Sequence, residues 1–264
     1  MINSIFLLIF GLILLIAGGE FLVKSAVSFA NKLNVSPFLI GVTVVSFGTS
    51  APELMVSIQA AFDNAAGISL GNVVGSNIAN IGLVLGLTAL VKPIIIEKKK
   101  YLISWFFMFA AAIFMWVVSV NPFGDGIEVT FFEGCFLFFC LLVFIFVTIK
   151  FNKINDAEND SDEEKSFLIS SLFLFLGGAG LYLGSDLFVS NAIFIARSIG
   201  ISEFIIGVTI VAFGTSLPEL VTSLVAILRN QNSISIGNLI GSNIFNVFAV
   251  LGITSIIKPL VSET

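Results

Sequence analysis

Two glutamates lie inside apolar stretches, and each follows a proline. Glu53 and Glu219 end Gly-Thr-Ser-x-Pro-Glu segments that are separated by an offset of 166 residues. On a helix, Ser46, Thr49, Ser50 and Glu53 are spaced i, i+3, i+4 and i+7, so they form one stripe of oxygen-bearing side chains. A carboxylate at membrane depth costs about 2.5–3.5 kcal/mol or more unless it finds a partner. Since no Lys or Arg lies at comparable depth in the sequence, the two glutamates indicate a bound cation, a proton, or both in alternation.

A second motif follows each glutamate and recurs at the same offset. It is Gly-Asn-Val-Val-Gly-Ser-Asn-Ile-Ala-Asn at 71–80 and Gly-Asn-Leu-Ile-Gly-Ser-Asn-Ile-Phe-Asn at 237–246. Its polar residues are spaced i, i+4 and i+8 and predict another stripe. Between 41–93 and 207–259 no gap is needed, and 29 of 53 aligned pairs are identical. The stripes of the two copies contain Asn72, Ser76 and Asn80 in the first, and Thr215, Ser216, Glu219, Asn238, Ser242 and Asn246 in the second.

These side chains offer only carboxylate, hydroxyl and amide oxygens. Hard oxygen ligands suit Ca²⁺, Na⁺ or Mg²⁺ and argue against zinc or copper. Two glutamates would balance the charge of one Ca²⁺. Pro52 and Pro218 are expected to free the carbonyls of Gly48 and Gly214, four residues earlier, as further ligands. Close helix packing is expected at the motif glycines, which are Gly71, Gly75, Gly82, Gly237 and Gly241.

The whole chain has the composition of a membrane protein. Of its 264 residues, 57% are hydrophobic and 11% are charged, and mean hydropathy is +1.09, whereas soluble domains carry about 25% charged residues. Apolar runs of membrane-spanning length recur, and nothing in the sequence indicates a nucleic-acid partner or a bound cofactor. The sequence predicts an all-α polytopic protein with about eight membrane segments, at roughly 4–24, 37–62, 68–91, 101–120, 129–149, 167–196, 203–228 and 234–257.

The distribution of basic residues predicts the orientation. Ten of the twelve Lys and Arg residues fall on one side, opposite to the N-terminus, which places the N-terminus outside and the 150–166 linker in the cytoplasm of a plasma (inner) membrane. Five segments separate the starts of the repeats, so the second copy enters from the opposite face. We therefore expect an inverted-repeat transporter fold, with repeats at 1–149 and 167–264. Glu20 and Lys24, four residues apart, are expected to pair on the surface of the first helix.

The doubled pair of motifs resembles the α-repeats of the Ca²⁺/cation antiporter superfamily, above all the prokaryotic sodium/calcium exchangers. The resemblance covers nearly the whole chain. It implies exchange of Ca²⁺ for Na⁺ by alternating access around a cluster of four ion sites, with the first and sixth helices sliding across the core. It implies no enzymatic activity. By motif position, the ion ligands would be Glu53, Glu219, Thr49, Ser50, Ser76, Asn80, Thr215, Ser216, Ser242 and Asn246.

The sequence departs from this family in two ways. Some exchangers have Asp at the position of Asn246, and its replacement leaves two acids, so H⁺ remains an alternative to Na⁺ as the coupling ion. The family usually has ten helices, five in each repeat, and eight are expected here, so a truncated cation-binding homologue without transport is a further alternative. An intramembrane hydrolase that uses both glutamates as acid and base is disfavoured, because the chain has no His and no convincing metal-ligand set for such chemistry. The oligomeric state stays open.

Overall fold

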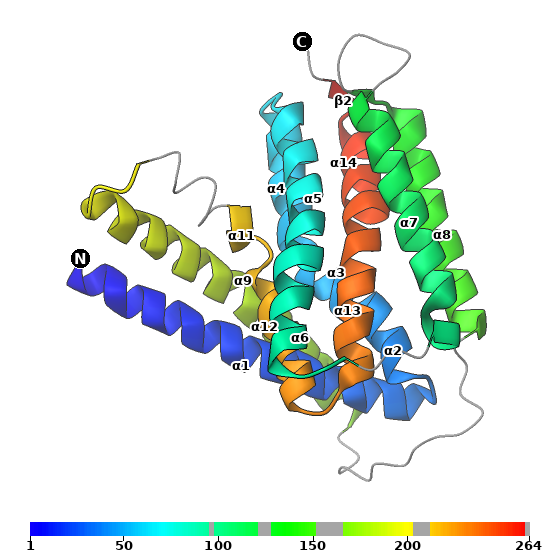
Figure 1. The fold of residues 1–264 in the computed structure, drawn as a ribbon, viewed down its shortest axis with the longest axis horizontal. Coiled ribbons are helices and arrows are strands. Elements are labelled where there is room, and N and C mark those ends of the chain that lie inside the picture. Colours follow the sequence, from blue (N-terminus) through cyan, green and yellow to red (C-terminus); the bar gives the residue numbers. More distant parts are fainter. Residues whose placement is uncertain (95–97, 121–127, 152–165, 203–211, 262–264) are drawn as a thin grey trace.

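The computed structural model describes residues 1–94, 98–120, 128–151, 166–202 and 212–261. The fold in this part is helical (Figure 1), apart from one pair of short antiparallel strands, β1 (Glu128–Val129) and β2 (Leu260–Val261). The expected 150–166 linker falls mostly outside the described residues, as does the start of the segment expected at 203–228.

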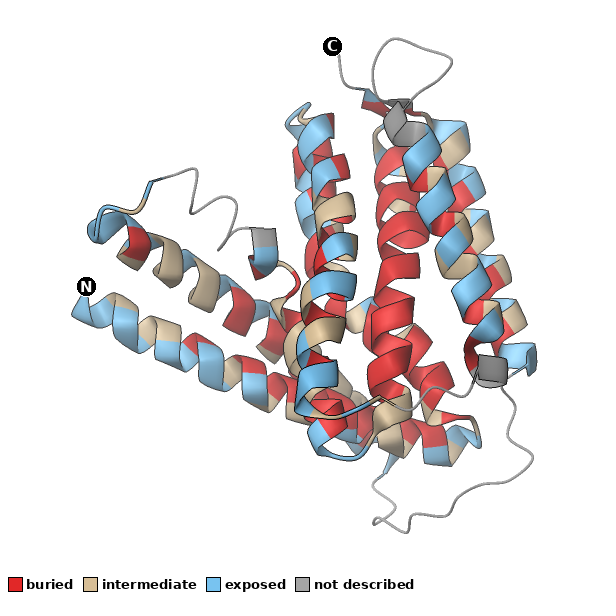
Figure 2. Cartoon of the chain, viewed as in Figure 1, coloured by how far each residue is buried: buried red, intermediate tan, exposed pale blue. Residues whose placement is uncertain are grey.

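Five helices are long and apolar enough to cross a membrane, or six if one bent pair counts as a single span. They are α1 (Ile2–Leu33), α8 (Phe131–Phe151), α9 (Phe167–Ser198) and two composite helices. Two shorter apolar helices, at Tyr101–Val117 and Leu217–Leu228, lie in the other expected segments. The protein is therefore an all-helical membrane protein. Figure 2 shows exposed faces along the outer helices, where many large apolar side chains are accessible, as in a surface that meets lipid.

Equivalent elements recur at the 166-residue offset of the sequence. α4 (Ala51–Phe62) matches α12 (Leu217–Leu228), and α5 (Ala66–Ala79) matches α13 (Asn232–Phe245). Each of α5 and α13 continues through a π-helical turn, η2 (Asn80–Leu85) or η4 (Asn246–Leu251), into α6 (Gly86–Val91) or α14 (Gly252–Ile257). The two composite helices run in opposite directions (Figure 1). Residues preceding α4 form α2 (Pro37–Ile40), the π-helical turn η1 (Gly41–Val45) and α3 (Ser46–Thr49), while only α11 (Ala212–Gly214) is described before α12.

Asparagines in the left-handed region end the corresponding helices in the same way. Asn64 (φ 57°) follows α4, and Asn230 (φ 61°) follows α12. Each asparagine side chain accepts a hydrogen bond from a lysine of the other repeat, since Lys258 binds Asn64 and Lys92 binds Asn230. The two contacts are equivalent under the 166-residue offset, and each ties a helix end of one repeat to the other.

Helices α1 and α9 pack as a close antiparallel pair that lies obliquely to the upright bundle (Figure 1). A Cβ atom on Gly18 would lie 2.8 Å from the Gly177 carbonyl, and one on Gly11 would lie 2.8 Å from the Gly184 carbonyl. Such approach requires glycine. The first segment, expected at 4–24, is longer than predicted. It continues to Leu33 because no Pro interrupts it, and Asn34 (φ 49°) ends it.

The two composite helices have different surroundings although their sequences are alike. In the most apolar 18-residue stretch of α13–α14, 83% of the residues are buried, whereas 33% are buried in the corresponding stretch of α5–α6. Gly237 and Gly241 meet the backbone of η1 and its neighbours at 2.7–2.8 Å, as expected, and Gly252 packs on α8 at Gly134. For Gly71, Gly75 and Gly82 a Cβ would meet nothing within 4 Å among the described residues. The counterpart of η1 in the second repeat, 207–211, lies outside the described residues, so close packing at these three glycines stays a prediction. Helix α7 (Lys98–Val120) and α8 lie beside α13–α14 and contribute to its greater burial, together with α2, η1 and α3.

Candidate ion-binding site

Both glutamates lie just after a break in a helix. The break is at Ser50 (φ −86°, ψ 4°) in one repeat and at Ser216 (φ −85°, ψ 5°) in the other. In the first repeat the segments Pro37–Thr49 and Ala51–Phe62 are bent by 42°. Pro52 and Pro218 stand in the first turns of α4 and α12, where a helix needs no N–H donor. The glutamates occupy the same first turns, where the helix dipole favours negative charge.

The two carboxylates are fully buried and incompletely paired. Neither oxygen of Glu53 has a hydrogen-bond partner among the described residues, and Oε2 of Glu219 also has none. Glu219 Oε1 accepts a 3.5 Å hydrogen bond from the Ser50 hydroxyl of the opposite repeat. The two carboxylates are close enough to repel each other. Buried carboxylate oxygens without partners are costly, so the arrangement needs positive charge between or beside them.

Hydroxyl pairs bridge the two repeats on either side of the glutamates. Thr49 Oγ1 lies 3.3 Å from Ser242 Oγ, and Thr215 Oγ1 lies 3.3 Å from Ser76 Oγ. The pairs are equivalent under the 166-residue offset, and each joins the helix break of one repeat to the composite helix of the other. The site therefore lies where the two repeats cross.

Asn80 and Asn246 begin the π-helical turns η2 and η4 and are fully buried. Neither polar atom of the Asn80 amide has a partner among the described residues. Asn246 donates to the Asn77 side chain at 3.1 Å, which leaves its own Oδ1 unpaired. π-Helical turns are rare and often occur at functional sites, and η2 and η4 each begin with an amide oxygen that has no partner in the described part of the chain.

The ten predicted ligands thus fall into two groups. Cross-repeat contacts connect Thr49, Ser50, Ser76, Thr215, Glu219 and Ser242. The other four are buried and have at least one side-chain oxygen without a partner among the described residues, and they are Glu53, Asn80, Ser216 and Asn246. The ten residues are Glu, Ser, Thr and Asn, so the ligands that they offer a cation are oxygens. Such a set can coordinate Ca²⁺ or Na⁺.

Ser46 of the first predicted stripe and the Gly214 carbonyl, predicted as a further ligand, have other roles. The Ser46 hydroxyl donates to the Gly41 carbonyl at 2.8 Å and packs against α13 near Asn238. The carbonyl of Gly214, expected to be free for an ion, accepts a 2.9 Å hydrogen bond from Ser185 on α9. These contacts position the helices around the site.

Asn77 and Asn243 were not predicted to contribute. Asn77 donates to the Asn243 carbonyl at 3.3 Å and accepts from Asn246, so it links the two composite helices beside the site. The signal was present in the sequence, because both asparagines end a Gly-Ser-Asn triplet that is identical in the two copies.

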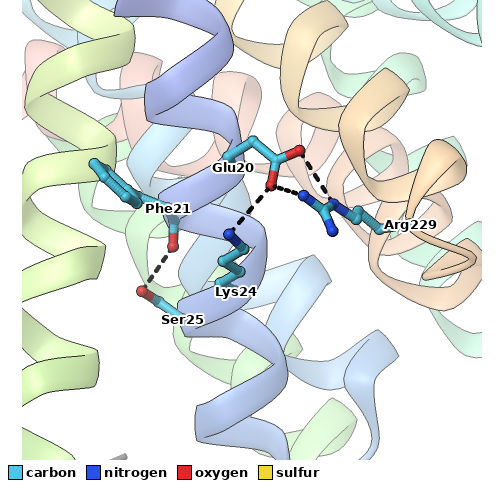
Figure 3. A network of polar contacts seen from close by, with 5 residues as sticks. All are labelled: Glu20, Phe21, Lys24, Ser25 and Arg229. Carbon is cyan, nitrogen blue, oxygen red and sulfur yellow. Dashed lines mark hydrogen bonds and ion pairs between the residues drawn. The ribbon is translucent and has the colours of Figure 1, made fainter. Parts of the chain in front are cut away.

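A charged contact lies at one end of the site helices (Figure 3). Glu20 pairs with Lys24 at 3.7 Å, as the i, i+4 spacing predicted. Its shorter contacts are with Arg229 at the end of α12, at 3.1 Å from Nε and 2.7 Å from Nη2. This bidentate pair connects α1 to the helix that carries Glu219.

Comparison with known proteins identifies the class of molecule. The family model for the sodium/calcium exchanger protein matches residues 3–150 and 169–264. The chain is 40% identical over 256 residues to the uncharacterized membrane protein MJ0091 of Methanocaldococcus jannaschii, which covers 96% of this chain and 82% of that protein. It is 36% identical over 293 residues to the sodium/calcium exchanger MaX1 of Methanosarcina acetivorans, with 96% and 83% covered.

Solved structures agree with this result. The sodium-calcium exchanger NCX_Mj, in crystals soaked with Na⁺ and Ca²⁺, superposes with a TM-score of 0.82 at 38% identity, covering 100% of this chain and 85% of that one. The matches cover both motif copies and the helices between them, so the protein is a transporter and not an enzyme. The chain belongs to the sodium/calcium exchanger family.

Proposed function

We propose that the protein exchanges Ca²⁺ for Na⁺ across the membrane by alternating access, with the ten oxygen-bearing residues described above as its ion ligands. The observation that carries this proposal is the pair of fully buried glutamates with unpaired oxygens where the repeats cross. Two carboxylates carry two negative charges. One Ca²⁺ balances these charges, and so do two monovalent cations, so the site has the same net charge with either load. Without any cation, the two buried carboxylates would be uncompensated, which is costly.

The same site can hold protons instead of Na⁺. Asn246 supplies an amide where a third carboxylate would add a negative charge, so two charges are all that the coupling ion must neutralise. Proton-coupled Ca²⁺ exchange is therefore the competing outcome that the experiment below separates.

The helix pair α1–α9 provides an asymmetry suited to alternating access. The second half of α1 packs along α12, where a Cβ on Gly19 would lie 3.2 Å from the Val221 side chain, and Glu20 binds Arg229. Among the described residues, α9 makes no comparable contact with α4, its equivalent partner. We infer that the contact of α1 with α12 closes the site toward the end of α1, and that sliding of the α1–α9 pair across the core would exchange the two sides.

We place the protein in the plasma membrane with its N-terminus outside and the 150–166 linker in the cytoplasm, on the basis of the Lys and Arg distribution. With 1–149 and 167–264 as the inverted repeats, the contact between α1 and α12 then closes the cytoplasmic side.

The test is radioactive Ca²⁺ uptake into proteoliposomes loaded with Na⁺, compared with vesicles that have equal Na⁺ on both sides and vesicles with a pH gradient. Glu53→Gln and Glu219→Gln are measured beside the wild type. Glu133→Gln is the matched control, because Glu133 also lies in the first turn of a membrane helix but hydrogen-bonds Thr130 away from the site.

We expect the Na⁺ gradient to drive uptake, both site variants to abolish it, and Glu133→Gln to retain it. Uptake that follows only the pH gradient would establish proton coupling. Calcium binding without uptake under any gradient would refute transport by this chain.

A further inference from the structure

Asn72 and Asn238 make the same two hydrogen bonds in the two repeats, and neither belongs to the proposed ligand set. Asn238 Nδ2 donates to the Glu219 carbonyl at 3.4 Å and to the Ser223 hydroxyl at 3.1 Å. Asn72 Nδ2 donates to the Glu53 carbonyl and to the Ser57 hydroxyl, both at 3.1 Å. Each amide therefore connects the glutamate helix to the composite helix that follows it. We call these two hydrogen bonds of each asparagine the brace.

These bonds also fix which way the amide points. A backbone carbonyl only accepts hydrogen bonds, so the NH₂ group must face Glu219, and the Asn238 oxygen must face the other way. That oxygen lies 3.1 Å from the Thr49 hydroxyl of the opposite repeat and accepts a longer hydrogen bond, at 3.5 Å, from Ser242 on its own helix. Asn238 is completely buried, so this contact is shielded from bulk water.

The contact favours one position of the Thr49 proton. Within 3.5 Å, Thr49 Oγ1 has three hydrogen-bond partners among the described residues, of which Asn238 Oδ1 is the nearest at 3.1 Å, followed by Ser242 Oγ at 3.3 Å and the Ser46 carbonyl at 3.4 Å. The Glu219 carboxylate also lies near this hydroxyl, on the side of the site where an ion would bind. A hydroxyl ligates a cation through its lone pairs, so its proton has to point away from the ion. If Asn238 Oδ1 accepts the Thr49 proton, the lone pairs of the Thr49 oxygen already point into the site before an ion binds.

The equivalent threonine is arranged differently. For Thr215 the structure gives one hydroxyl neighbour, Ser76, and no hydrogen bond between Thr215 and Asn72 is described. The two asparagines thus share the brace, while Asn238 alone adds the contact to the threonine across the repeat boundary.

We propose that Asn238 is a positioning residue that orients the Thr49 hydroxyl for cation binding and acts on affinity through Thr49. This inference rests on the proposed exchange at Glu53 and Glu219. It predicts that Asn238 sets the apparent KM for Ca²⁺ more than the maximal rate, because pre-orientation of a ligand lowers the cost of binding.

The experiment is a double-mutant cycle of Na⁺-driven Ca²⁺ uptake with Thr49→Val, Asn238→Ala and the double variant. The matched cycle uses Thr215→Val, Asn72→Ala and their double variant. A hydrogen bond of this kind corresponds to roughly a 5- to 10-fold rise in KM. We expect the double variant at 49 and 238 to be no weaker than the worse single variant, whereas the effects at 215 and 72 multiply.

The brace itself is common to both cycles, so a purely structural role of Asn238 would give multiplicative effects in both. That result, with wild-type exchange intact, overturns the inference and leaves the proposed function standing. Absence of Na⁺-driven uptake in the wild type removes the proposed function and the inference with it.

Two less disruptive substitutions test the inference if the Asn238→Ala variant does not fold. Ser223→Ala removes one acceptor of the Asn238 amide without touching the site, and Ser57→Ala does the same for Asn72. We expect Ser223→Ala to raise KM about 2- to 3-fold in the wild type and to have no effect in the Thr49→Val background. An equal effect in both backgrounds contradicts the inference.

Discussion

Two adjacent glycines on α9 test whether the α1–α9 pair is held by direct backbone contact. A Cβ on Gly177 would lie 2.8 Å from Leu22 N and 2.9 Å from the Gly18 carbonyl, whereas a Cβ on Gly178 would meet nothing within 4 Å. The Gly178 result refers to the described residues, which include all of α1. We therefore compare Gly177→Ala with Gly178→Ala. Both changes add one methyl group and gain the same helix propensity, about 0.8–1.0 kcal/mol, so their difference isolates the packing.

The magnitude follows from the geometry. Ordinary Cβ contacts begin near 3.4 Å, and the opposing atoms on α1 are backbone, which cannot rotate out of the way. The two helices must separate, and overpacking of this kind costs about 1–3 kcal/mol. For a protein of this size that corresponds to a difference of about 2–12 °C between the two melting midpoints.

The assay heats both variants in detergent and measures the fraction that remains monodisperse in size-exclusion chromatography. We expect Gly178→Ala to melt at or slightly above the wild-type temperature and Gly177→Ala to melt below it. Equal midpoints, or a lower midpoint for Gly178→Ala, would refute close backbone packing of α1 on α9 at this position.

Three further predictions use other contacts of the bundle. Arg229→Gln should change the equilibrium between the two access states of the transporter by about 1.4- to 5-fold, because a half-exposed ion pair contributes that much. The measurement is the rate of maleimide labelling at Val225→Cys, in a variant that lacks Cys135 and Cys140. Lys24→Gln should change this equilibrium less, and the Arg229 effect should shrink at high ionic strength. Gly241→Ala should abolish folding or uptake, since its Cβ would lie 2.7 Å from the Val42 carbonyl, while Gly75→Ala should retain uptake because no described residue lies within 4 Å of its Cβ. Lys92→Met and Lys258→Met should lower the melting midpoint by similar small amounts, about 2–4 °C or less, because their contacts to Asn230 and Asn64 are equivalent.

Much of the site was predictable from residue types and spacing. The 166-residue offset predicted the equivalence of α4 with α12 and of α5 with α13, because identical cap and breaker residues give identical helix ends. The Pro-Glu pairs marked the helix breaks. Acids in apolar segments without basic neighbours indicated cation binding from residue chemistry alone.

The contacts between the repeats were not predictable from one copy of the motif. The binding of Glu20 to Arg229 joins residues 209 positions apart, and the local i, i+4 rule found only Lys24. Helical periodicity places Ser46 on the same stripe as Glu53, but the bend at Ser50 turns the segment before it toward α13. A stripe calculated for a straight helix therefore assigns too many residues to the site.

Identical residues in the two copies do not have identical surroundings, and this makes the repeat a natural control. Asn72 and Asn238 have the same chemistry and the same position in their motifs, yet among the described residues only Asn238 contacts the threonine of the opposite repeat. When equivalent substitutions differ in effect, the cause must lie in the neighbours, because residue type and local backbone are held constant. A site built on inverted repeats needs such differences, since alternating access requires the two halves to be packed differently at any one time.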